Sequence, residues 1–113
     1  MKESAPLALV TDYLVAGGVS SFIRNLGSGL SQLGFQEKLP VIVLEQTDTD
    51  EATQMPDCEV HALDRTMRRR IREDRLAEAY SILAHLRPRG VIAAIGAWSF
   101  ELLRHLPAGV MRI

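Results

Sequence analysis

The chain has 113 residues, of which 47% are hydrophobic and 24% are charged, and its formal net charge is −1. This length fits one domain with a buried core, and the apolar content excludes a disordered or low-complexity chain. The balance of charges argues against a general nucleic-acid-binding surface. The single cysteine, Cys58, cannot form an internal disulfide, so we expect a reducing, cytoplasmic setting.

The apolar pattern along the chain changes period several times. Short continuous apolar runs are typical of strands buried on both faces, and apolar residues at every third or fourth position are typical of amphipathic helices. These patterns predict strands at 7–10, 39–44, 58–63, 91–95 and 110–113. They predict helices at 19–33, 66–86 and 100–106, with Gly34 ending the first and Ser99 capping the third, and a loop or short helical turn at 45–56.

Alternating strands and helices with short connections indicate an α/β fold, a three-layer Rossmann-like domain with a parallel sheet. We expect the strand order 3-2-1-4-5 and a single domain over residues 1–113. Two glycines inside the first predicted helix, Gly27 and Gly29, each cost up to about 1 kcal/mol relative to alanine. We interpret both as positions where that helix packs closely on the sheet.

Ligands of such sheets bind beyond the carboxyl ends of the strands, where the strand order reverses. The candidate segments are therefore 12–18 and 96–99. Gly17 and Gly18 directly precede a helix, where glycine permits close approach and free N–H groups attract phosphate or carboxylate. A tight turn without a ligand is the other interpretation of this pair. Trp98 is either packing at an interface or a stacking platform for a sugar ring.

Several familiar chemistries lack the residues that they need. The dinucleotide-binding fingerprint needs a glycine where this chain has Val19, and no P-loop lysine follows the two glycines. A phospho-receiver domain needs clustered carboxylates, whereas one aspartate, Asp12, follows the first predicted strand. The three histidines have no metal-ligand spacing and no Gly-x-Ser-x-Gly run is present, so we expect neither a metal site nor a nucleophile elbow.

Charge is unevenly distributed despite its near-zero sum. Residues 45–64 contain seven acidic residues and no lysine or arginine, and residues 65–75 contain six arginines. Such a run is usually the solvated face of a surface helix. The alternative is a patch that docks on anionic lipids at the inner face of the membrane, or on an acidic partner, formed by Arg68, Arg69, Arg70, Arg72 and Arg75.

Most of the chain resembles the opening of GT-B fold glycosyltransferases, in particular the nucleotide-sugar-dependent retaining enzymes. The segments that carry the resemblance are Leu-Ala-Leu-Val-Thr-Asp at 7–12, Ala-Gly-Gly-Val at 16–19, Phe-Ile-Arg-Asn-Leu-Gly at 22–27, Leu-Ser-Gln-Leu-Gly at 30–34, and 83–96 with its Arg-Pro pair. The resemblance implies that Gly17 and Gly18 lie beside the donor diphosphate. It places Trp98 and Ser99 on the acceptor side and implies no cofactor beyond the nucleotide-sugar substrate. Asp12 and Gly96, from the two segments at the reversal of strand order, are further acceptor-side candidates.

Two departures from the family pattern affect the expected function. The family often has a histidine in or just after its fourth strand, whereas Ala93 to Gly96 contain none. The 113 residues also do not include the family's donor-binding domain. We therefore expect a truncated, acceptor-side part of a transferase that moves a sugar to an acceptor hydroxyl and is inactive alone. The alternatives are an inactive family member and a stand-alone, non-enzymatic module that binds a small anion or a protein. A coding sequence that continues into a second α/β domain distinguishes the transferase from the module.

Overall fold

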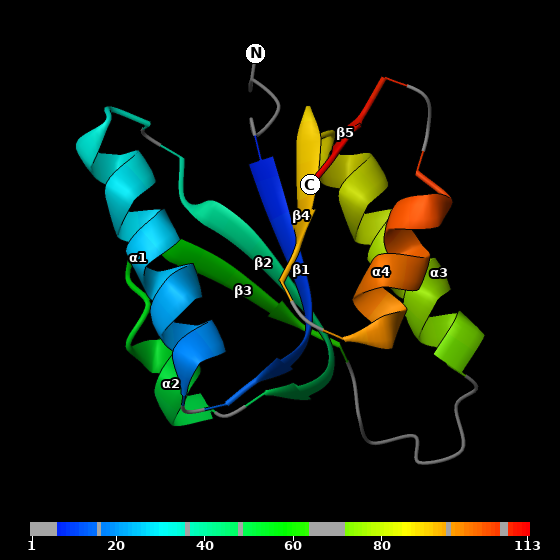
Figure 1. Cartoon of the computed structure of the whole chain (residues 1–113), viewed down its shortest axis with the longest axis horizontal. Helices are drawn as coiled ribbons and strands as arrows, with labels where there is room; N and C mark the ends of the chain where they lie inside the picture. Colours follow the sequence, from blue (N-terminus) through cyan, green and yellow to red (C-terminus); the bar gives the residue numbers. More distant parts are fainter. Residues whose placement is uncertain are drawn as a thin grey trace.

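Strands and helices alternate along the part of the chain that the computed structural model describes, which is residues 7–15, 17–35, 37–47, 49–63, 72–94, 96–106 and 109–113. The strands are β1 (Leu7–Leu14), β2 (Leu39–Thr47), β3 (Cys58–Ala62), β4 (Gly90–Ala93) and β5 (Met111–Arg112). The helices are α1 (Gly18–Gln32), α2 (Thr49–Thr53), α3 (Arg72–Leu86) and α4 (Ala97–Arg104), as Figure 1 shows. The predicted start of the second long helix, at 66, lies outside the described residues.

The sheet is parallel throughout and has the order β3-β2-β1-β4-β5, which confirms the predicted fold class and strand order. β1 lies at the centre, and its residue Val10 is in register with Ile42 of β2 and Ala93 of β4. The order reverses between β1 and β4. The described residues that follow these two strands, 15 and 17–18 after β1 and 94 and 96–97 after β4, therefore lie at the same edge of the sheet.

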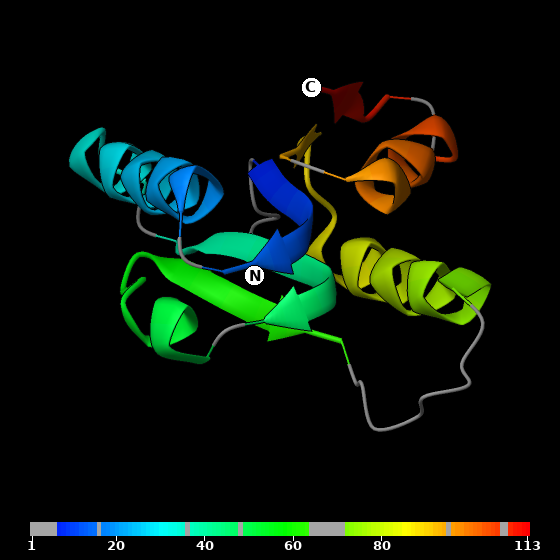
Figure 2. The same ribbon diagram turned by 60° about the horizontal axis from the view of Figure 1, so that its bottom comes forward.

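The two faces of the sheet carry different helices. α1 and α2 cover one face, and α3 and α4 cover the other, as the two views in Figures 1 and 2 show. β1 serves both faces because its successive side chains alternate: Leu9 packs among the residues under α1, whereas Ala8 and Val10 pack under α3 and α4. None of the described helices is long and apolar enough to cross a membrane.

β1 is longer than its apolar run predicts. The strand continues through Thr11 and Asp12 to Leu14, and both polar residues are buried. The Thr11 hydroxyl donates a hydrogen bond to the carbonyl of Tyr13 at 2.9 Å, beside an irregularity in the register with β2. Buried polar groups of this kind are tolerated because they find partners, so a polar residue does not by itself end a strand.

The two glycines inside α1 have different surroundings, so the shared interpretation is correct for Gly27 and wrong for Gly29. A Cβ atom at Gly27 would lie 2.8 Å from Cys58 Sγ and 3.3 Å from the Asp57 carbonyl oxygen. At Gly29 such an atom would meet nothing within 4 Å. Close approach to the start of β3 therefore requires the first glycine, whereas the second lies over open space.

This contrast predicts opposite effects of two alanine substitutions. Gly29→Ala is expected to raise the free energy of unfolding by about 0.5–1 kcal/mol, because alanine is the better helix former. Gly27→Ala is expected to lower it by about 1–3 kcal/mol, because the methyl group overpacks against Cys58. Urea unfolding followed by circular dichroism measures both, and equal effects at the two positions would contradict the packing.

β5 forms one edge of the sheet and leaves large apolar side chains in solvent. Met111 is 64% exposed and Ile113 is 54% exposed.

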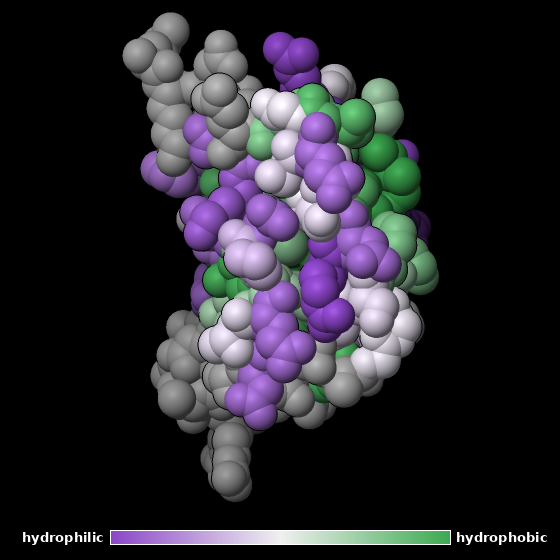
Figure 3. Space-filling view, turned by 90° about the vertical axis from the view of Figure 1, so that its left-hand side faces the viewer, coloured by the Kyte–Doolittle hydropathy of each residue, from purple (hydrophilic) through white to green (hydrophobic). Residues whose placement is uncertain are grey.

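Figure 3 shows the side of the molecule on which α1 and α2 lie, where hydrophilic residues extend along much of the face and hydrophobic ones gather toward one border.

Candidate functional site

Gly17 forms the turn between β1 and α1, and the helix begins at Gly18. Gly17 has a φ of +140°, and its carbonyl accepts a hydrogen bond from the Ser21 N–H at 3.1 Å. The Ser20 hydroxyl donates to the Val15 carbonyl and so ties the first turn of the helix to the end of the strand. A φ in this region favours glycine, which explains the first residue of the pair.

The N-terminus of α1 is open. Within the described residues, no side chain caps it, and no acidic residue lies in its first turn. Both glycines are exposed, and a Cβ atom at either position would meet nothing within 4 Å. The first N–H groups of a helix have no partner inside it and carry about half a positive charge, so this turn presents unmatched donors to solvent.

The N-terminus of α4 is capped by an aspartate from β1. One oxygen of the Asp12 carboxylate accepts hydrogen bonds from the Ser99 N–H at 2.9 Å and the Ser99 hydroxyl at 2.8 Å. The other oxygen accepts from the Trp98 N–H at 3.3 Å. Asp12 is 3% exposed and Ser99 is fully buried. The Asp12 carboxylate therefore acts as the N-cap of α4, although Asp12 lies 86 positions before Trp98 in the sequence.

Gly96 allows this cap to form. It precedes α4 with a φ of +108°, and a Cβ atom there would overlap the carboxylate carbon and one oxygen of Asp12. Both the backbone conformation and the space beside Asp12 exclude a side chain. The prediction that Ser99 caps the helix is wrong, because α4 begins at Ala97 and Ser99 is a donor within its first turn.

The predicted site residues thus separate into two groups at the same edge of the sheet. Asp12, Gly96, Trp98 and Ser99 form one connected cluster, built on hydrogen bonds to the carboxylate and on close contact with the glycine. The Gly17–Gly18 turn is a separate feature, at the start of α1. The sequence marks both segments, but it does not indicate that Asp12 neutralises one of the two helix ends.

Trp98 packs its half-buried side chain against the core under α3 and α4. This contact supports the packing interpretation, and the stacking of a sugar ring stays a prediction. Of the arginine cluster, Arg68, Arg69 and Arg70 lie outside the described residues. The backbone of Arg72 and Arg75 opens α3, and the structure does not describe their side chains.

The other chemically active groups do not form a site in the described part of the chain. Burial, together with the charge of Asp57, raises the pKa of the Cys58 thiol to about 11, so this buried side chain stays protonated at neutral pH. His61 pairs with Glu59 at 2.7 Å, whereas His105 pairs with Glu101 on α4 at 3.1 Å. No group of three or more His, Cys, Asp or Glu residues among those described is placed to hold a metal ion.

Comparison with known proteins returns no match to a family model, a curated protein or a solved structure. The functional argument therefore rests on the residues of this chain and on the order of its strands. Within the described residues, no side chain caps the N-terminus of α1. This turn is therefore the feature of the chain that is open to a ligand.

Proposed function

We propose that this chain is the acceptor-side, Rossmann-like part of a cytoplasmic glycosyltransferase that moves a sugar from a nucleotide-sugar to an acceptor hydroxyl. One observation carries the proposal: the N-terminus of α1 lies at the reversal of strand order, is uncapped by the described side chains, and begins with two exposed glycines. The resemblance of 7–34 and 83–96 to the opening of GT-B enzymes supports the same assignment.

The contrast between the two helix ends favours α1 as the one that meets the donor diphosphate. A helix N-terminus has about half a positive charge. At the N-terminus of α4 the unit negative charge of the Asp12 carboxylate more than offsets it. A second anion there would be repelled by Asp12. At α1 an anion meets unmatched N–H groups and no acidic side chain in the first turn.

In this proposal, electrostatic stabilisation is the main chemical contribution of the chain. The N–H groups after Gly17 stabilise the charge that develops on the departing diphosphate, and one such donor is typically worth about 10²–10³ in rate. A separate donor-binding domain supplies the nucleotide pocket. Asp12 and Ser99 hold the start of α4 and so position Gly96 and Trp98 toward the acceptor. The arginine cluster at 68–75 docks the enzyme on the inner face of the membrane.

Inorganic pyrophosphate tests the anion site directly. Titration of the ¹⁵N-labelled chain is expected to shift the amide resonances of Gly17, Gly18 and Val19, and to leave those of Trp98 and Ser99 unchanged. Gly18→Asp is expected to remove these shifts without lowering stability, because an acidic residue in the first turn favours the helix. Gly29→Asp adds the same charge away from this turn and should still bind.

Two results would contradict the proposal. The first is the absence of any shift at Gly17 to Val19, or equal shifts at both helix ends. The second is sugar transfer by the 113 residues alone, because the nucleotide pocket is assigned to another domain. Anion binding by a protein whose coding sequence encodes no donor-binding domain would instead identify the stand-alone module.

A further inference from the structure

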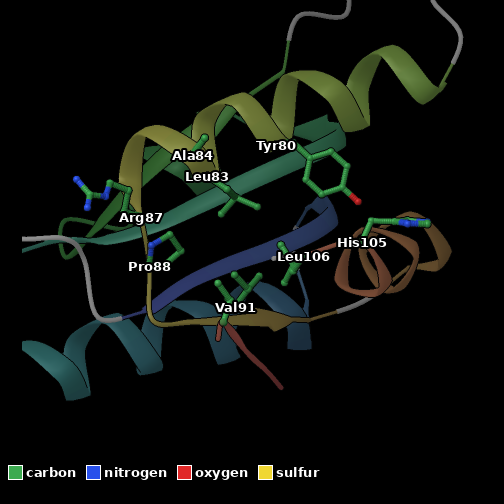
Figure 4. A pocket seen from close by; sticks show the side chains of 9 residues that line it. Tyr80, Leu83, Ala84, Arg87, Pro88, Val91, His105 and Leu106 are labelled. Atoms are coloured by element: carbon green, nitrogen blue, oxygen red, sulfur yellow. The ribbon is translucent and has the colours of Figure 1, made fainter. Parts of the chain in front are cut away.

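A groove lies between α3 and α4 on the face of the sheet opposite α1. Its volume is about 570 Å³, which is within the range of about 300–1,000 Å³ found for small-molecule sites. Its floor consists of the buried side chains of Leu83, Val91 and Leu106, which come from α3, β4 and the segment just after α4 and point toward one another in Figure 4. The groove is therefore apolar at its base.

Polar groups lie at the two ends of this groove. Figure 4 shows Arg87 at one end, and Tyr80 and His105 at the other. The Tyr80 hydroxyl donates to the Leu102 carbonyl at 3.0 Å, and burial, with the nearby charge of Glu101, raises its pKa and keeps it protonated. His105 pairs with Glu101 at 3.1 Å, so charge at this end is matched within α4.

The charge at the other end is positive. Arg87 is exposed, and no acidic side chain of the described residues pairs with it. The negative end of α4, which lies on the His105 side of the groove, is already neutralised: the Arg112 guanidinium donates to the carbonyls of Leu103 at 2.7 Å and Leu106 at 3.0 Å. The unmatched charge beside the apolar floor therefore belongs to Arg87.

The backbone at Arg87 is unusual for its residue type. It has a φ of +52°, and its N–H donates to the Leu83 carbonyl at 2.8 Å, closing the last turn of α3. Helices commonly end with a residue in this left-handed conformation, and that residue is usually glycine, because a Cβ atom is strained there. This chain instead holds a long cationic side chain at the mouth of an apolar groove.

We propose that the groove binds a small monocarboxylate with an extended apolar tail, the tail lying over Leu83, Val91 and Leu106 and the carboxylate pairing with Arg87. The apolar floor selects the tail and the unmatched guanidinium selects the charge. This site is independent of the proposed function, because it lies between the C-terminal ends of α3 and α4, whereas the anion site lies at the N-terminus of α1.

Decanoate and decanol test the two halves of this site, since they share a tail and differ in charge. Calorimetric titration of the 113-residue chain is expected to show decanoate binding about threefold more tightly, the scale of an exposed ion pair. Ala84→Trp, at an exposed helical position lining the groove, is expected to block both ligands. Equal affinity for the two ligands, or binding unaffected by Ala84→Trp, would overturn the proposal.

Substitution of Arg87 separates binding from folding. Arg87→Gly suits the left-handed backbone, so it is expected to keep or raise the thermal midpoint while reducing decanoate affinity to that of decanol. Arg87→Asn also tolerates this conformation and gives a second neutral side chain. Arg89→Ala removes a nearby exposed arginine that does not line the groove and should retain the preference. Retention of the preference in both Arg87 variants would refute the role of Arg87.

Discussion

Gly96→Ala is expected to lower the free energy of unfolding by about 4 kcal/mol or more, a large part of the roughly 5–15 kcal/mol that stabilises a domain. Two effects combine. A φ of +108° strains any residue with a Cβ atom by about 1–3 kcal/mol, and the new atom would overlap the Asp12 carboxylate. Asp12 cannot move aside without losing its hydrogen bonds to Trp98 and Ser99. Urea unfolding monitored by circular dichroism measures the loss.

Two other glycines serve as controls for this substitution. At Gly17 the φ of +140° is also strained but the space is open, so Gly17→Ala is expected to cost only the strain, about 1–3 kcal/mol. At Gly18 the space is open and the φ is ordinary for an L residue, so Gly18→Ala is expected to be neutral or to stabilise by up to about 1 kcal/mol. A loss at Gly96 no larger than that at Gly17 would show that Asp12 does not restrict the position.

Asp12→Ala is expected to cost about 3–5 kcal/mol, because it leaves the buried donors of Ser99 and the half-buried Trp98 N–H without an acceptor. Asp12→Asn keeps the shape and one acceptor oxygen, so a smaller loss of about 2 kcal/mol is expected. Chemical denaturation of both variants provides the comparison. An alanine variant as stable as the natural chain would mean that α4 does not depend on this carboxylate.

Ser99→Ala isolates one of the three hydrogen bonds, since it removes the hydroxyl and keeps the backbone donor. In a double-mutant cycle with Asp12→Ala, we expect a coupling energy of about 1–2 kcal/mol, because residues in one buried network are not additive. Ser28→Ala, on α1 and outside this cluster, is the matched control and should combine additively with Asp12→Ala. Additivity at Ser99 within about 0.5 kcal/mol would contradict the shared network.

The architecture was predictable because its signals are local. The apolar run at 7–10 and the periodicity from Val19 to Leu33 each identify an element, and the rules for parallel connections then order the strands. Gly17 and Gly18, at the start of α1, are a local signal as well, and they indicate the turn that follows β1 at the carboxyl edge of the sheet. These inferences need only neighbouring residues and the general handedness of the chain.

The rest of the site depends on contacts between distant residues. Thr11 and Asp12 are polar, so their pattern indicates the end of a strand, yet both lie inside β1. Thr11 bonds locally to the Tyr13 carbonyl, whereas Asp12 depends on Ser99, 87 positions further along the chain. Ser99 resembles a cap in sequence, but the acceptor that starts α4 comes from β1. Gly27 and Gly29 occupy similar positions in the helical pattern, and only the contacts of Gly27 with Cys58 and Asp57 distinguish them. The groove beside Arg87 likewise arises from the spacing of two packed helices.

The hydrogen bonds between Asp12 and Ser99 also limit how early the chain can finish folding during translation. The two residues are 87 positions apart. At a synthesis rate of about 5–20 residues per second, roughly 4–17 s pass between their appearance. Throughout that interval the central strand exposes a carboxylate with no helix to receive it. A nascent chain therefore cannot complete its core early, and a chaperone that shields β1 has a defined period in which to act.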